Sequence, residues 1–216
     1  MTGKQMKLYS YWRSTAAYRV RIALNLKGIA YETVPVSLIA EGSQQHSAAY
    51  VALNPQQLVP SLQLADGSIL TQSLAIIDYL ESLAPEPPLL PADPYSRARV
   101  LAVCHAVAMD IHPINNLRVV ARLGEVFDAD AAAKTEWMLH WMRLGFGPLE
   151  AMVQPGPFAF GQNPGLADIC LIPQLYNARR WGLDFSPYPK LTAIEAACLA
   201  LPAFAQAAPE AQPDAV

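Results

Sequence analysis

A proline-rich stretch divides the chain into two parts of different character. Residues 84–94 hold five prolines, at positions 85, 87, 88, 91 and 94, and proline can neither continue a helix interior nor donate in a β-ladder. Before this stretch short apolar runs alternate with turn residues, and after it apolar residues recur at a helical period. The sequence predicts an α+β domain at residues 1–84, a linker at 85–94 and an all-helical domain at 95–216.

Within the first part the elements follow in the order strand, helix, strand, loop, strand, strand, helix. The first two strands flank a helix that ends before Gly28, a crossover that favours parallel pairing. Asp66 and Gly67 lie between two apolar runs and predict an antiparallel hairpin. This βαβ-ββα order is typical of a thioredoxin-like domain. The predicted elements cover residues 8–12, 14–27, 31–36, 40–52, 58–64, 68–70 and 74–81.

Pro60 stands at the head of the third predicted strand. X–Pro bonds are cis in only about 5–6% of cases in folded proteins. In a thioredoxin-like domain, however, the proline at this place is cis and faces the start of the first helix. The pattern therefore favours a cis bond between Val59 and Pro60.

Ser14 and Thr15 stand at the start of the first predicted helix. Either hydroxyl oxygen can cap the helix by accepting from a free N–H of the first turn, which stabilises it by about 1 kcal/mol. Alternatively, a hydroxyl at this place can donate to an anion held at the positive end of the helix, and a thiolate is such an anion. The turn contains no cysteine, so that thiolate would have to belong to a ligand. Both interpretations stay open at this point.

The composition argues against several classes of partner. The formal net charge is −3, with both signs distributed along the chain, so nothing indicates binding to nucleic acid or to a membrane surface. No apolar run reaches the roughly 18 residues of a membrane span, and residues 1–6 lack the apolar core of a signal peptide. Cys104, Cys170 and Cys198 form no CxxC pair and predict a reducing compartment without a metal site. We expect a cytoplasmic protein.

Four segments of the chain resemble the zeta class of glutathione transferases. They read STAAYRVRIAL at 14–24, NPQQLVP at 54–60, QSLAI at 72–76 and DFSPYP at 184–189, and the resemblance spans about residues 7–214. It implies the glutathione transferase fold, glutathione as the cofactor, a small dicarboxylate substrate and a homodimer. It also implies a cis–trans isomerase that converts maleylacetoacetate or maleylpyruvate to the fumaryl isomer in aromatic catabolism.

The resemblance assigns roles to residues of the first domain. Ser14 and Thr15 would stabilise the glutathione thiolate. The position of Arg13, just before them, predicts separately that it meets the substrate next to the sulfur. Gln72 and Ser73 would hold the γ-glutamyl carboxylate at a helix start, where backbone N–H groups are available to an anion. The residues predicted to bind glutathione are Gln45, Gln56, Val59, Pro60, Gln72 and Ser73.

The implied isomerisation also needs groups that hold oxyanions. Addition of a thiolate to the maleyl double bond places negative charge on a carbonyl oxygen, and the substrate carries two carboxylates. Guanidinium groups suit both tasks because they are planar and can bind a carboxylate through two N–H groups. The residues predicted to bind the substrate are Arg13, His112, Asn116, Arg118 and Arg180.

Alternatives to this interpretation stay open. A transferase that conjugates glutathione to small halogenated acids would use the same thiolate, and a glutathione-binding module without catalysis would share the fold. The hydroxyl pair and the arginines favour an enzyme. The sequence does not decide between the two maleyl substrates, between Arg179 and Arg180 as the residue that faces the site, or whether His112 transfers a proton.

Two positions depart from the family pattern. Ala16 stands where the family turn usually has a cysteine after two serines, so any role of that cysteine is absent here. Gly165 stands where a Ser or Thr usually opens the capping box of which Asp168 is the acidic half. We expect this second departure to cost about a few tenths of a kcal/mol of stability.

Overall fold

The computed structural model describes residues 5–39, 42–154 and 156–216. The chain forms two compact units, Met1–Pro88 together with Leu201–Val216, and Leu89–Ala200. The boundary near residue 88 lies within the predicted linker. The C-terminal residues differ from the prediction, because their contacts group them with the first unit and not with the helical one.

The first unit combines strands and helices from both ends of the chain. Its elements are β1 (Met6–Ser10), α1 (Thr15–Leu26), β2 (Tyr31–Pro35), the 3₁₀ helix η1 (Gln44–His46), α2 (Ala48–Leu53), β3 (Ser61–Gln63), β4 (Ile69–Thr71), α3 (Ser73–Leu83), α10 (Pro202–Ala205) and the 3₁₀ helix η3 (Pro209–Ala211).

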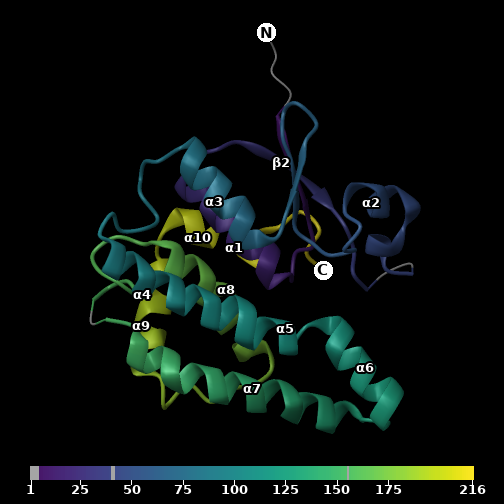
Figure 1. Cartoon of the computed structure of the whole chain (residues 1–216). Helices are drawn as coiled ribbons and strands as arrows, with labels where there is room; N and C mark the ends of the chain where they lie inside the picture. Colours follow the sequence, from purple (N-terminus) through teal and green to yellow (C-terminus); the bar gives the residue numbers. More distant parts are fainter. Residues whose placement is uncertain (1–4, 40–41, 155) are drawn as a thin grey trace. The chain divides into compact units, whose positions relative to one another are not determined.

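The strands form one sheet in the order β2-β1-β3-β4. β1 and β2 are parallel and joined by α1, whereas β3 is antiparallel to both β1 and β4. Helices α1 and α3 lie side by side (Figure 1). Leu8 and Leu62 on the central strands and Ile22, Ile76 and Leu80 on these helices are fully buried. The predicted thioredoxin-like order of elements is confirmed, although positions 40 and 41 of the predicted 40–52 segment lie outside the described residues.

Three segments meet at one end of this sheet. β1 ends there just before α1 begins, and because β3 is antiparallel to both neighbours, β3 begins and β4 ends at the same place. The peptide bond between Val59 and Pro60, just before β3, is cis as predicted. The register therefore brings Ser14, Val59 and Ser73 to the same end of the sheet.

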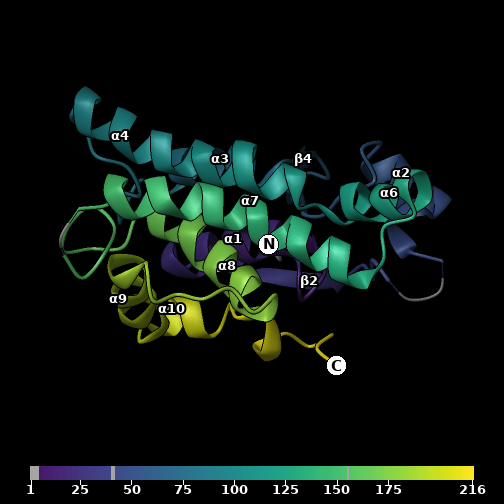
Figure 2. The ribbon, with the colours of Figure 1, turned by 90° about the horizontal axis from the view of Figure 1, so that it is seen from below.

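The second unit is helical. Its elements are α4 (Pro94–His105), the π-helical turn η2 (Ala106–Ile111), α5 (His112–Ile114), α6 (Leu117–Phe127), α7 (Ala131–Met152), α8 (Leu166–Arg180) and α9 (Pro189–Leu199). Helix α8 packs against α4 and α9, and most of its side chains are buried. The start of α9 lies beside the end of α7 (Figure 2). Among the described residues, the helices all fall short of the length or the hydropathy that a bilayer crossing requires.

Residues 94–127 do not form one continuous helix. Helix α4 runs into the π-helical turn η2, which is followed by α5 and, after Asn115 and Asn116, by α6. Pro113 lies in α5 and lacks the N–H that a continuing helix would use. The helical path therefore breaks just after Pro113, and a π-helical turn precedes it.

The structure explains the glycine at the start of α8. The Leu166 N–H donates to the Leu89 carbonyl at 2.8 Å, and a Cβ at Gly165 would lie 3.0 Å from that same oxygen. Asp168 caps the helix by accepting from the Gly165 N–H and the Ala159 N–H, each at 2.8 Å. Burial raises the pKa of the Asp168 carboxyl, and these hydrogen bonds oppose part of the rise. The close approach of the Leu89 carbonyl therefore disfavours the larger Ser or Thr at position 165.

Candidate active site

A tight turn places two hydroxyls at the start of α1. The Ser14 N–H donates to the Tyr11 carbonyl at 2.9 Å, and the Ser14 Oγ caps α1 by accepting from the Ala17 N–H at 3.2 Å. Thr15 is the first helical residue and is buried. Because Ser14 caps the helix through an oxygen lone pair, its hydroxyl proton can still be donated to another group. Capping and donation to a thiolate are therefore compatible roles for the same side chain.

Arg13 directly precedes these two residues in the chain, and its side chain lies on Trp12. Its guanidinium carbon lies 4.0 Å from the centre of the Trp12 ring, and Trp12 itself is buried. A cation–π contact of this kind restricts a long side chain without using its N–H donors. The N–H groups of the guanidinium therefore stay available to an oxyanion.

Val59 is packed against the same turn. It belongs to an apolar cluster with Tyr11, Trp12, Val36 and Tyr50. Since Tyr11 and Trp12 lead directly into the turn before α1, this cluster fixes the backbone at Val59 relative to the helix start.

The loop before Val59 is held by a buried asparagine. Asn54, with 1% of its surface exposed, donates from Nδ2 to the Leu58 carbonyl at 2.8 Å and to Ser61 Oγ at 3.1 Å, and its Oδ1 accepts from the Gln56 N–H at 3.0 Å. The Tyr50 hydroxyl donates to the same Leu58 carbonyl at 2.7 Å. Two donors thus fix the Leu58 carbonyl, and the planar trans peptide directs the next N–H, that of Val59, the opposite way.

Replacing Asn54 with Ala is expected to weaken glutathione binding by about tenfold, because the loss of hydrogen bonds worth about 0.5–1.5 kcal/mol each leaves the loop to be ordered on binding. Titration calorimetry with glutathione measures the effect. Ser82→Ala is the control, since the Ser82 hydroxyl also donates to a backbone carbonyl, that of Asp78 at 3.0 Å, near the far end of α3. An affinity in Asn54→Ala equal to that of the control would contradict the prediction.

Gln72 has an unusual backbone conformation at the start of α3. Its φ of 68° and ψ of 117° lie where side chains other than glycine cost about 1–3 kcal/mol. Its Nε2 donates to Gln56 Oε1 at 3.0 Å. Ser73 is buried, and its Oγ accepts from the Arg19 guanidinium at 3.2 Å. Strain of this size at a helix start, where N–H groups are available to an anion, is typical of a ligand site.

Gln45 is connected to the same loop through a histidine. Its Nε2 donates to His46 Nε2 at 3.3 Å, and His46 Nδ1 donates to Gln57 Oε1 at 2.5 Å. Within the described residues, Gln45 Oε1 is buried and makes no hydrogen bond. The structure therefore links Gln45 to the loop that carries Gln56 and Val59.

The break between α5 and α6 collects three of the residues predicted for the substrate. His112 begins α5, and Asn116 caps α6 by accepting from the Arg118 N–H at 3.1 Å. The side chain of Arg118 is exposed. The sequence did not single out Asn115, which is buried and whose two amide atoms make no hydrogen bond to the described residues. The adjacent pair of asparagines after Pro113 was the signal that could have drawn attention to it.

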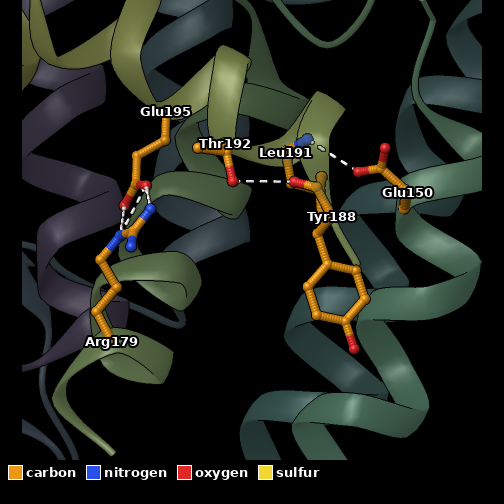
Figure 3. Close-up of polar contacts among 6 residues, drawn as sticks. All are labelled: Glu150, Arg179, Tyr188, Leu191, Thr192 and Glu195. Atoms are coloured by element: carbon orange, nitrogen blue, oxygen red, sulfur yellow. Dashed lines mark hydrogen bonds and ion pairs between the residues drawn. The ribbon is translucent and has the colours of Figure 1, made fainter. Parts of the chain in front are cut away.

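The structure distinguishes Arg179 from Arg180. The Arg179 Nε donates to both carboxylate oxygens of Glu195, at 2.8 and 3.0 Å, and its Nη2 donates to the same carboxylate (Figure 3). Its guanidinium carbon also lies 4.1 Å from the centre of the Phe185 ring. These hydrogen bonds raise the pKa of Arg179. Both arginines are exposed. Because the Arg179 guanidinium is already engaged by Glu195 and Phe185 within its own unit, Arg180 stays the predicted substrate ligand.

Known proteins resemble this chain along almost its whole length. Residues 8–88 match the family model described as glutathione S-transferase, N-terminal domain. A probable maleylacetoacetate isomerase of Vibrio cholerae is 49% identical over 211 residues, which cover 96% of this chain and 97% of that protein. Among solved structures, a holo maleyl pyruvate isomerase described as a bacterial zeta-class glutathione S-transferase has a TM-score of 0.93 at 48% identity, covering 97% of this chain and 100% of that one.

A further solved relative carries ligands. It is a maleylacetoacetate isomerase of Methylobacterium extorquens with bound malonate and GSH, with a TM-score of 0.92 at 42% identity, covering 97% of this chain and 99% of that one. The fold, the hydroxyls at the start of α1 and these relatives all indicate the same family. The chain belongs to the zeta class of the glutathione S-transferase family.

Proposed function

We propose that this protein is a glutathione-dependent isomerase that converts the cis double bond of maleylacetoacetate or maleylpyruvate to trans. The observation that carries the proposal is the turn before α1, where the Ser14 and Thr15 hydroxyls stand at the positive end of a helix and the preceding residue, Arg13, holds its guanidinium over the Trp12 ring. The names of the relatives support the same activity.

Glutathione fits the groups that the first unit offers. A carboxylate is the ligand group that would satisfy the helix start at Gln72 and Ser73, and the fixed backbone of Val59 offers an N–H to a peptide. The amide oxygen of Gln45, which is buried and makes no hydrogen bond within the described residues, offers an acceptor. We propose that the first unit holds glutathione and that residues of the second unit hold the dicarboxylate.

In this mechanism bound glutathione supplies the sulfur nucleophile that adds to the double bond, allows rotation about it and then leaves. Ser14 and Thr15 donate to the sulfur anion, and each unit by which they lower its pKa corresponds to about 1.4 kcal/mol. Arg13 offers its N–H groups to the oxygen on which negative charge develops. Arg118 and Arg180 bind carboxylates of the substrate through two parallel hydrogen bonds each.

The direct test is a spectrophotometric assay of maleylacetoacetate and maleylpyruvate with and without glutathione. We expect isomerisation of at least one substrate that depends strictly on glutathione. Conjugation or dehalogenation of small halogenated acids without isomerisation would replace this proposal with a transferase, and glutathione binding without any turnover would replace it with a binding module.

Arg118→Ala is expected to raise KM or lower kcat for the maleyl substrate by about 10- to 100-fold, since a hydrogen bond to a charged group is worth about 1.5–3 kcal/mol. The affinity for glutathione should not change, and calorimetry measures it. Arg122→Ala is the control on the same helix, because Arg122 pairs with Glu125 at 2.9 Å on the exposed surface. Kinetics of Arg118→Ala equal to those of the control would remove Arg118 from the proposed site.

We also propose that the protein is a cytoplasmic homodimer. The three cysteines are buried thiols and their spacing contains no CxxC pair, which suits a reducing compartment, and the zeta-class family implies the dimer. Sedimentation equilibrium measures the mass of the assembly, and fractionation of source cells measures the compartment.

A further inference from the structure

The peptide groups of Trp12 are held from two sides. The Trp12 N–H donates to Asp214 Oδ2 at 3.0 Å, although the two residues lie 202 positions apart in the chain. The Trp12 carbonyl accepts from Arg21 Nη2 at 3.0 Å. Trp12 lies inside the turn that the Ser14 N–H closes onto the Tyr11 carbonyl. The orientation of this turn is therefore set in part by a residue near the C-terminus.

Arg21 joins the turn to the C-terminal segment as well. It is fully buried, and besides Trp12 it donates to Ser10 Oγ at 3.0 Å and to the Ala207 carbonyl at 2.8 Å. One guanidinium group thus links the end of β1, the turn before α1 and the segment after α10. Because the guanidinium is planar and rigid, its three bonds fix these partners relative to one another.

The C-terminal segment has its own internal order. Gln212 Nε2 donates to the Gln206 and Ala208 carbonyls, each at 2.9 Å, and the Ala215 N–H donates to the Gln212 carbonyl at 3.1 Å. Ala215 packs against the apolar cluster that contains Trp12. These contacts keep Asp214 in reach of the Trp12 N–H.

The Asp214 carboxylate is not arranged for stability alone. Its second oxygen, Oδ1, is buried and makes no hydrogen bond within the part of the chain that the structure describes. A buried carboxylate oxygen without a partner costs free energy. The bond that this carboxylate makes to the Trp12 N–H ties it to the turn before α1 despite that cost.

We infer that residues 201–216 are a positioning element of the active site and that Asp214 is its positioning residue. By holding Trp12, Asp214 places the Ser14 and Thr15 hydroxyls where they meet the sulfur of bound glutathione. This inference rests on the proposed use of glutathione, but it does not depend on which substrate is isomerised.

The test compares Asp214→Ala with Asp214→Asn in the full chain. Both variants remove the negative charge, but the Asn amide oxygen can still accept from the Trp12 N–H. The ultraviolet absorbance of the thiolate, followed against pH, gives the pKa of the sulfhydryl of bound glutathione. We expect Asp214→Asn to keep kcat within about twofold of the wild type and Asp214→Ala to lower it by about tenfold, the effect of one lost hydrogen bond, with a higher sulfhydryl pKa than in Asp214→Asn.

Asp66→Ala is the matched control, because Asp66 likewise accepts a backbone hydrogen bond, from Ser68 at 2.8 Å, in the turn between β3 and β4. It should change neither the sulfhydryl pKa nor kcat. Asp214→Glu is the second variant, used if Asp214→Ala does not fold. It keeps the charge but moves the carboxylate by one methylene, so its kcat and sulfhydryl pKa are compared with those of the wild type. Equal sulfhydryl pKa values and equal kcat in the Ala and Asn variants, or in the Glu variant and the wild type, would overturn the inference.

The same measurements separate this inference from the proposed function. If the wild type isomerises neither maleyl substrate, the proposed function fails. The sulfhydryl pKa of bound glutathione still reports whether Asp214 positions the turn.

Discussion

Removal of both hydroxyls from the start of α1, by Ser14→Gly and Thr15→Val together, is expected to lower kcat for isomerisation by about a hundredfold. Hydrogen bonds to a charged acceptor are worth about 1.5–3 kcal/mol each, and without them less of the bound glutathione is ionised at neutral pH. The sulfhydryl pKa of bound glutathione should rise in the same variant. Stopped-flow or steady-state kinetics and the thiolate absorbance measure the two quantities.

The choice of glycine at position 14 separates catalysis from helix capping. Glycine is a tolerated N-cap and costs only about a few tenths of a kcal/mol relative to serine, so the fold should be kept. Asp130→Gly provides the control, because Asp130 caps α7 by accepting from the Ala133 N–H at 2.8 Å. If the double variant retains wild-type kcat and sulfhydryl pKa, the hydroxyls have no part in the chemistry.

Asp168→Ala is expected to lower the free energy of unfolding by about 2–5 kcal/mol. The substitution leaves the N–H groups of Ala159 and Gly165 without their acceptor, and each buried unsatisfied donor costs about 1–3 kcal/mol. Cys198 Sγ also donates to Asp168 Oδ1 at 3.8 Å. Denaturant unfolding followed by helical circular dichroism measures the change.

Asp184→Ala is the control for this experiment. Asp184 accepts from the Ser186 N–H at 2.9 Å and from the Ser186 hydroxyl at 2.7 Å, but it lies on the exposed surface. We expect its replacement to cost about 1 kcal/mol or less, because water replaces the lost partner. A loss of stability in Asp168→Ala no larger than this would show that Asp168 does not hold the start of α8.

The elements could be predicted where the signal is local. The proline-rich stretch, the Asp66-Gly67 turn and the hydroxyls before an apolar helix each act within a few residues, so the sequence predicts the boundary, the hairpin and the start of α1. To predict the cis bond at Pro60, the order of the strands was needed as well. The roles of Arg118 and Arg180 stay predictions that rest on the chemistry of guanidinium groups and on the places of these residues in the chain.

Other features depend on partners far away in the chain. Arg179 and Arg180 are neighbours of the same type, and only the position of Glu195 on α9 separates them. Neighbouring residues do not explain the glycine at position 165. The structure does, because a Cβ at this position would lie 3.0 Å from the Leu89 carbonyl oxygen. The residue type at position 72 does not predict its backbone conformation, because a φ of 68° favours glycine and this residue is glutamine.

The sequence by itself determined the two kinds of domain, the order of strands and helices, and the family, because propensities, turn chemistry and motifs are properties of short stretches. Only the tertiary structure decided that residues 201–216 join the first unit and that Asp214 and Arg21 hold the turn at Trp12. A hydrogen bond across 202 positions of the chain leaves no periodicity in the sequence. It exists because the folded backbone brings its donor and acceptor together.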